Sequence, residues 1–200
     1  NRSGNLDIWI MDLETGNTSR LTDDPAGDWD PAFTPDGQFV LWSSDRSGNM
    51  EIWMSAVDGS GARQISRDGK DAENPTMTRD GQWVVYASGH DDKRGIWKVR
   101  PDGTDATQLT SGSHLLPELS PDGRFVLFNM IQQLDSFVKV LDFESGEILD
   151  FQLNLRVTER DENLVFVWKN RGGLNWEIEL PLDFGLNKLF VRLAFFERPH

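Results

Sequence analysis

The chain has 200 residues, with 33 acidic and 20 basic side chains, a formal net charge of -13 and no cysteine. Its length allows one domain or one and a half, and its charge argues against nucleic acid and anionic membrane surfaces, because both attract clustered Lys and Arg. The lack of cysteine excludes disulfides, thiolate metal sites and thiol catalysis.

The ends of the chain and its apolar runs give two further expectations. The sequence opens Asn-Arg-Ser-Gly-Asn, without an initial Met or a signal-peptide pattern, so we expect a fragment from which any signal peptide is already missing. No apolar run approaches 18 residues, so we expect no membrane insertion.

Four landmarks recur in fixed order along the first part of the chain, 42 or 44 residues apart. They are a triplet ending in Ile-Trp at 7–9, 51–53 and 95–97, an aliphatic-hydroxyl pair at 21–22, 65–66 and 109–110, a proline at 31, 75 and 117, and an Asp-Gly pair at 36–37, 80–81 and 122–123. A fixed period of this size is typical of repeat architectures.

Each period divides into short strands. In the second copy the positions of the turn residues predict strands at 31–34, 39–44, 51–56 and 62–66, because Asp-Gly pairs favour tight turns and the flanking residues are β-branched or aromatic. No stretch has a convincing helical period with caps. We therefore predict an all-β chain of β-propeller blades, each of four antiparallel strands, in about three to four repeats of 42–44 residues.

The repeat resembles a known family. Arg20-Leu-Thr, Trp29-Asp-Pro-Ala-Phe-Thr-Pro-Asp-Gly and Ser-Asp-Arg-Ser-Gly-Asn-Met-Glu-Ile-Trp are similar to the bacterial WD40-like PD40 repeat of the TolB-family propeller. The third copy departs from it, with Arg79 in place of Pro. The resemblance covers roughly residues 3–153 and implies a propeller fold, an extracytoplasmic or periplasmic location and no single function, since such propellers serve as lids, docking platforms and sensors.

The landmarks stop after residue 153. Residues 163–169, 174–182 and 188–196 alternate like strands, and a Gly-Gly pair at 172–173 predicts a hairpin between the first two. We therefore divide the chain into PD40-like repeats at 1–153 and a divergent β-rich tail at 154–200. The tail is a degenerate blade, the start of another β domain, or sequence foreign to the repeats.

Few residues suggest catalysis. The tryptophans of the Ile-Trp triplets are interpreted as packing residues between blades, and the Asp-Gly aspartates as turn formers. No Gly-x-Ser-x-Gly, Walker or dinucleotide pattern is present. His90 and His114, without ligand spacing between them, are interpreted as solvated loop residues. We predict no catalytic residue, no bound metal and no enzyme activity for this chain.

One stretch of oxygen-bearing side chains suggests calcium. Asp45, Ser47, Asn49 and Glu51 alternate as hard-cation ligands do. Gly48, however, is fourth in this stretch, whereas an EF-type loop has its glycine sixth. We therefore predict no cofactor and keep Ca²⁺ as a weak alternative.

Blade topology predicts where a partner binds. The loop between the second and third strands and the connection to the next blade emerge on one face, which we call the loop face, and the tight Asp-Gly turns lie on the opposite turn face. Residues that bind partners usually lie on variable loops of a rigid scaffold. The candidate binding residues on the loop face are Asp28, Trp29, Asp30, Asp45, Arg46, His90, Asp91, Asp92 and His114, with Arg67, Lys70, Asp71, Lys93 and Arg94 beside them.

Two functions are consistent with these patterns. The favoured one is a non-catalytic TolB-like scaffold that binds a protein or peptide. We expect the partner's contact region to be basic and association to slow as salt rises. The alternative is the gating or sensor propeller of a larger enzyme, such as a prolyl-oligopeptidase-like serine peptidase, or of a signalling protein. We also expect the repeats to form an open arc or part of a larger ring, with exposed strand edges.

Overall fold

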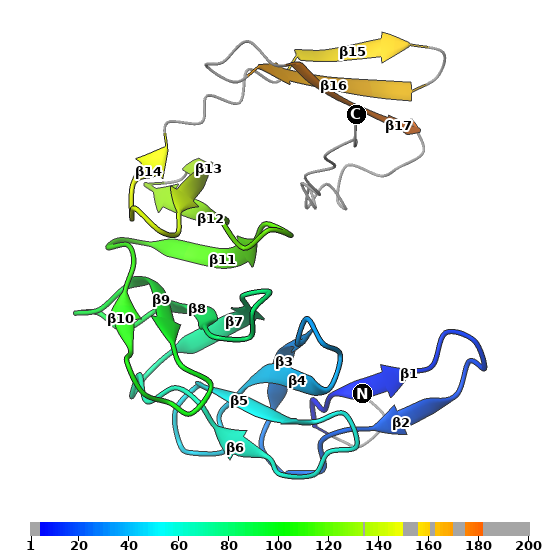
Figure 1. The fold of residues 1–200 in the computed structure, drawn as a ribbon, viewed down its shortest axis with the longest axis vertical. Coiled ribbons are helices and arrows are strands. Elements are labelled where there is room, and N and C mark those ends of the chain that lie inside the picture. Colours follow the sequence, from blue (N-terminus) through cyan, green and yellow to red (C-terminus); the bar gives the residue numbers. More distant parts are fainter. Residues whose placement is uncertain (1–4, 134, 150–155, 161–162, 170–174, 182–200) are drawn as a thin grey trace. The chain divides into compact units, whose positions relative to one another are not determined.

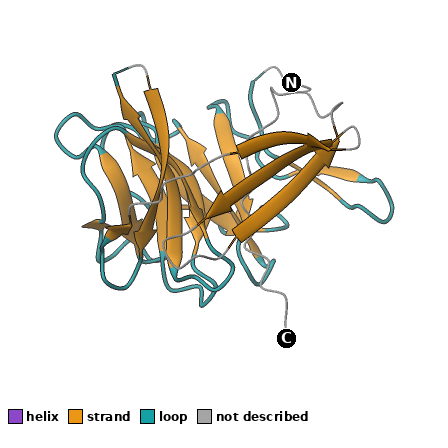
Figure 2. Cartoon of the chain, turned by 90° about the horizontal axis from the view of Figure 1, so that it is seen from above, coloured by secondary structure: helices purple, strands orange, loops and turns teal. Residues whose placement is uncertain are grey.

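The computed structural model describes residues 5–133, 135–149, 156–160, 163–169 and 175–181. Its regular elements within those ranges are strands, joined by loops and turns (Figure 2). No helix in this described part is long and apolar enough to cross a membrane. The chain divides into two compact units, Asn1–Ile148 and Leu149–His200.

The first unit contains a short hairpin followed by three four-stranded sheets in chain order (Figure 1). The hairpin is β1 (Trp9–Met11) and β2 (Thr18–Arg20). Blade 1 is β3 (Asp28–Phe33), β4 (Phe39–Ser44), β5 (Glu51–Ala56) and β6 (Arg63–Gln64). Blade 2 is β7 (Ala72–Met77), β8 (Val84–Ser88), β9 (Gly95–Val99) and β10 (Thr107–Gln108). Blade 3 is β11 (His114–Leu119), β12 (Phe125–Gln132), β13 (Asp135–Asp142) and β14 (Ile148–Leu149).

Within each blade every strand is hydrogen-bonded to the next in sequence. The pairs with a recorded register are antiparallel, as in Leu41 opposite Met54 and Tyr86 opposite Trp97. These sheets confirm the predicted all-β class and the four-stranded blade.

The first strand of blade 1 begins at Asp28, earlier than the predicted start at residue 31. Asp28 and Trp29 pair with Ser44 and Ser43, and the register then shifts before Ala32. Asp30, at the shift, has a φ of 52°. Such a bulge inserts one extra residue and allows a proline without an N–H, so the Asp-Pro pair lies inside the strand rather than before it.

The aliphatic-hydroxyl landmark is explained by a repeated hydrogen bond. Thr22 Oγ1 accepts the Ile8 N–H at 2.9 Å, Ser66 Oγ accepts the Ile52 N–H at 2.8 Å, and Thr110 Oγ1 accepts the Ile96 N–H at 3.0 Å. In each copy the hydroxyl satisfies a buried amide of the Ile-Trp triplet, which would otherwise be costly. The two landmarks are therefore halves of one contact.

The Asp-Gly turns share another arrangement. Thr34 Oγ1 donates to Asp36 Oδ1 at 2.6 Å, and the same oxygen accepts the Gln38 N–H at 3.0 Å. The bonds recur at Asp80 and Asp122. They hold the pKa of each carboxyl below its usual range, so these aspartates remain ionised and structural.

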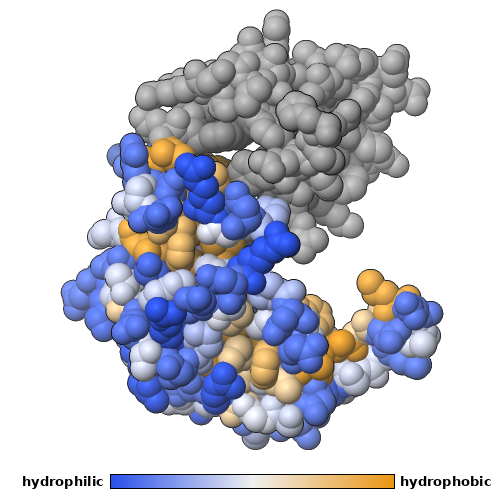
Figure 3. All heavy atoms as spheres, in the orientation of Figure 1, coloured by the Kyte–Doolittle hydropathy of each residue, from blue (hydrophilic) through white to orange (hydrophobic). Residues whose placement is uncertain are grey.

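Apolar clusters join neighbouring blades. Leu41 and Ile52 of blade 1 pack with Val84 and Tyr86 of blade 2. A second cluster joins blades 2 and 3 and includes Phe128. The first strands also contact each other in order, β3 with β7 and β7 with β11 (Figure 1). Figure 3 shows apolar residues as narrow areas among hydrophilic ones on the face that it draws.

The triplet tryptophans differ in environment. Trp53 packs against the cluster of Ile8, Val40 and Trp42, and Trp97 packs against the cluster between blades 1 and 2. Trp9, in the terminal hairpin, is 39% exposed. Two of the three thus pack at blade boundaries.

The second unit contains β15 (Arg156–Arg160), β16 (Asn163–Lys169) and β17 (Asn175–Pro181), which pair antiparallel in that order. The predicted strand at 163–169 coincides with β16, and the one at 174–182 contains β17. No strand was predicted at β15. The predicted strand at 188–196 and the Gly-Gly pair lie outside the described residues.

Candidate functional site

On the loop face, two predicted binding residues, Asp28 and Arg46, form an ion pair with each other. Arg46 Nη2 donates to the two carboxylate oxygens of Asp28 at 2.7 and 2.9 Å, and the Trp42 indole N–H donates to Asp28 Oδ1 at 3.1 Å. The guanidinium carbon also lies 5.4 and 5.0 Å from the ring centroids of Trp42 and Trp53. The Asp28 side chain is fully buried, so its contacts hold blade 1 together.

His114 is a buried strand residue, so the interpretation as a solvated loop residue is wrong. It begins β11 and is 5% exposed. Its Nδ1 lies 2.7 Å from Thr110 Oγ1, and its ring centroid lies 4.8 Å from that of Phe128. Burial lowers the pKa of this imidazole, because the charged form loses solvation. His90 is only half-buried.

Four of the predicted residues are exposed acids: Asp30, Asp45, Asp91 and Asp92. Asp45 Oδ1 accepts the Gly27 N–H at 3.0 Å. Asp91 forms ion pairs with Lys70 and, at 3.4 Å, with Arg94. The Asp92 N–H donates to His90 Nδ1 at 3.2 Å. These carboxylates leave much of their surface open to solvent.

Trp29 is half-buried and packs against its own chain. A Cβ built on Gly27 would lie 2.2 Å from the Trp29 ring, so only glycine allows this close approach. The ring therefore rests on the connection that leads into β3.

The structure also brings acids together from two blades. Burial, then the charges of Asp71 and Asp30, raise the pKa of Glu73, because each disfavours the ionised form. Sequence reasoning had placed Asp30 and Asp71 on the loop face but missed Glu73. The repeat held a signal: Glu73 occupies the position of Trp29 and Leu115 in the other copies.

The residues considered as calcium ligands form hydrogen bonds with separate partners. Glu51 is buried and accepts bonds from the Asp68 and Gly69 N–H groups at 2.9 and 2.7 Å. Ser47 Oγ donates to the Asn49 carbonyl oxygen at 3.2 Å. Across the described ranges, no three His, Asp or Glu side chains group as metal ligands.

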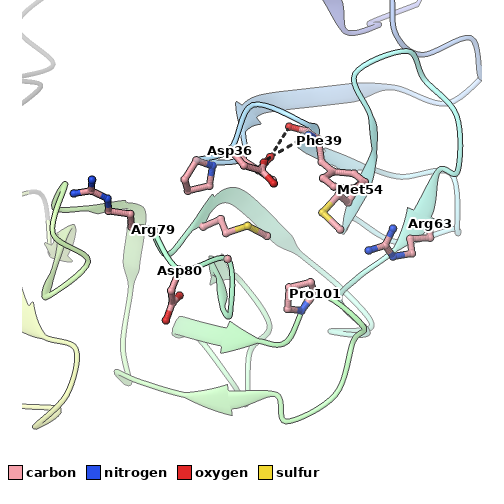
Figure 4. A pocket seen from close by; sticks show the side chains of 11 residues that line it. Asp36, Phe39, Met54, Arg63, Arg79, Asp80 and Pro101 are labelled. Carbon is pink, nitrogen blue, oxygen red and sulfur yellow. Dashed lines mark hydrogen bonds between the residues drawn. The ribbon is translucent and has the colours of Figure 1, made fainter.

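A hollow of about 250 Å³ lies on the turn face, between blades 1 and 2 (Figure 4). Phe39, Met54, Met77 and Pro101 supply apolar lining. Arg63 and Arg79 lie on opposite sides of it in Figure 4. The loop-face prediction missed this pocket, although Arg79 departs from the proline of the repeat.

Comparisons with known proteins match this architecture. The family described as the TolB beta propeller domain (PD40) matches residues 1–156. No curated protein matches the chain. Among solved structures, TolB from Acinetobacter baumannii is 23% identical with a TM-score of 0.66, covering 88% of this chain and 48% of that one. The chain thus spans about half the length of that TolB.

Two enzymes also share the fold. An oligogalacturonate lyase from Vibrio parahaemolyticus is 14% identical with a TM-score of 0.54, over 87% of this chain and 57% of that one. A puromycin-hydrolysing peptidase from Mycobacterium tuberculosis is 18% identical with a TM-score of 0.57, over 86% of this chain and 30% of that one. At such identities the likeness shows the fold alone.

Proposed function

The chain belongs to the TolB beta propeller domain family, and on that premise we propose that it is a non-catalytic scaffold for protein or peptide binding. The turn aspartates support this role, since Asp36, Asp80 and Asp122 each accept bonds within their own turn. Asp28 likewise serves the blade through Arg46. We assign the chain no catalytic residue, metal or cofactor.

The observation that carries the proposal is the grouping of Asp30, Asp71 and Glu73 on the loop face. Burial, and then the like charges of Asp71 and Asp30, raise the pKa of Glu73, so the acids of this group repel one another. A basic segment of a partner relieves that repulsion on binding. The exposed Asp45 and Asp92 extend the acidic area across the loops.

A binding experiment tests this proposal. The purified protein is titrated with a Lys-rich peptide and with a Ser/Gln peptide of equal length, at low and high salt. We expect binding of the basic peptide only, weakening as salt rises. The double variant Asp30→Asn, Glu73→Gln should weaken it, whereas Asp102→Asn, an exposed turn-face control, should not. Equal affinity for both peptides, or tighter binding of duplex DNA, contradicts the proposal.

A second candidate is the propeller part of a larger enzyme or signalling protein. The coverage of only 30% of the puromycin-hydrolysing peptidase favours it, because most of that enzyme lies outside the shared region. Turnover of peptidase, esterase or glycosidase substrates by the full-length protein, but not by residues 1–200, would support this candidate. Turnover by residues 1–200 would contradict the non-catalytic proposal.

We further propose an extracytoplasmic location, on the basis of the family alone. Fractionation of the native cells tests it. Recovery of the protein with periplasmic markers is the expected result, and recovery with cytoplasmic markers contradicts it.

A further inference from the structure

The turn-face pocket lies on the opposite face of the blades from the acidic loops. Its volume of about 250 Å³ exceeds a cavity that holds benzene and falls below that of a typical cofactor site. It therefore suits one large apolar side chain. Met54 and Met77 in its lining provide a surface that adapts to an inserted group.

The next blade boundary shows how the same position is filled from within. Lys98, Trp83 and Phe143 occupy the repeat positions of Met54, Phe39 and Pro101. Lys98 Nζ lies 4.5 Å from the Trp83 ring centroid and 4.8 Å from that of Phe143, so a long cation covers both rings. At the boundary of blades 1 and 2, the shorter residues leave the hollow open.

Both arginines of the pocket depart from the repeat. Arg63 stands where the other copies have Ser19 and Thr107, and Arg79 stands where they have Pro35 and Pro121. Both are exposed. Within the described part of the chain neither guanidinium has a hydrogen bond, ion pair or stacked ring, whereas Arg100 at the next boundary stacks on Trp83 at 4.1 Å. Two cations that are available to a ligand therefore flank the apolar hollow.

The pocket also contains Asp36 and Asp80, which belong to the turns. Each uses Oδ1 for a hydroxyl and a backbone N–H of its own turn, and the equivalent Asp122 of blade 3 does the same. They are therefore common to the turns. The next boundary also has cations, but Lys98 and Arg100 there stack on aromatic rings, so what distinguishes this boundary is a pair of arginines without such partners.

We propose that this pocket binds an acidic peptide segment, with one apolar side chain in the hollow and carboxylates on either side paired with Arg63 and Arg79. In an extended peptide, residues i, i+2 and i+4 share one face and span about 13 Å. A sequence of the form acidic-x-apolar-x-acidic therefore presents the apolar group between two carboxylates. This site is separate from the loop face and takes a segment of opposite charge.

Isothermal titration of the purified protein with short, end-blocked peptides tests the proposal. The probe is Glu-Ser-Phe-Ser-Glu, and the controls are Gln-Ser-Phe-Ser-Gln and Glu-Ser-Gly-Ser-Glu. We expect the probe to bind at least about tenfold more tightly than either control, because each control lacks one of the two contacts. Phenylpropionate serves as a small carboxylate without a peptide chain.

Variants copied from the other repeats separate charge from folding. Arg79→Pro and Arg63→Thr each introduce a residue that the same position already has elsewhere, and each should weaken the probe about fivefold. Pro101→Phe, which copies Phe143, should block the hollow without changing charge. Arg124→Gln removes a cation from the same face one blade further on and should leave the affinity unchanged. Thermal unfolding verifies that each variant is folded.

Three results would overturn the proposal. They are equal affinity for the Glu and Gln peptides, unchanged affinity in the folded Arg63→Thr and Arg79→Pro variants, and binding of phenylpropionate without binding of the probe. None of these results bears on the Lys-rich peptide, so failure here is distinguishable from failure of the loop-face proposal.

Discussion

His114 begins β11 at the position that Asp28 takes at the start of β3, and both residues are buried, at 5% and 3% exposure. Asp28 is hydrogen-bonded to Arg46 of its own blade, and the His114 ring to Thr110 at the end of the preceding copy. The same site in the fold therefore holds a carboxylate in one blade and a neutral imidazole in another. Replacement of either side chain should therefore lower stability.

Replacing Asp28 by Asn should destabilise the protein by about 3 kcal/mol. The substitution removes the charge that faces Arg46, whose side chain is only 14% exposed, and breaking a buried ion pair leaves an uncompensated charge. Urea unfolding measures the loss. Asp45→Asn is the matched control, since Asp45 is exposed, and it should change stability by less than about 0.5 kcal/mol. Similar losses in both variants would contradict this assignment.

Stability should fall as pH drops below about 6.5, because of His114. Burial lowers the pKa of His114 in the folded protein, so the unfolded chain takes up the proton first. The stability contributed by neutral His114 is therefore complete above the pKa of the unfolded chain. It is lost as pH falls toward the pKa of the folded protein, by at most about 1.4 kcal/mol per pH unit. Unfolding of His114→Leu between pH 7.5 and 5.5 should lack this component, whereas His90→Gln should retain it.

The repeat could be predicted from the sequence because its landmarks are local. Thr22 and Asp36 act on groups within their own copy, so the same residue types recur at the same spacing. Pairing between distant residues could not be predicted in this way. Arg46 appeared to be a loop cation, because nothing in the linear sequence shows that its guanidinium turns back 18 residues to Asp28.

The turn-face pocket was missed for a related reason. An open volume depends on how side chains from two blades fill a shared space. Met54 and Lys98 occupy equivalent positions, yet only the packed structure shows that Lys98 reaches two rings. The sequence does show that Arg79 replaces a proline of the repeat. It does not show which residues lie around Arg79 in the folded protein.

Replacing Ser66 by Ala should cost about 1–3 kcal/mol, the range for leaving a buried hydrogen-bonding group unsatisfied. Ser66 Oγ accepts the Ile52 N–H at 2.8 Å and also donates to the Glu51 carboxylate. Ser66→Thr should restore most of the stability, since Thr22 and Thr110 take this role in the other copies. Thermal unfolding of the three proteins provides the comparison, and an equal loss for Ala and Thr would contradict the repeated contact.

Replacing Glu73 by Gln should stabilise the protein at neutral pH. The pKa of Glu73 is raised, first by burial and then by Asp71 and Asp30, so the folded state holds a proton more tightly than the unfolded chain does. Ionised Glu73 therefore opposes folding above its folded pKa, and this penalty disappears as pH falls toward the unfolded value. We expect a gain of roughly 0.5 kcal/mol at pH 7.5, reduced by solvent screening, and little gain at pH 4. Glu118→Gln, an exposed control on β11, should show no such pH-dependent gain. Urea unfolding across this range measures both variants, and a gain for Glu73→Gln that persists unchanged at pH 4 would point to a cause other than charge.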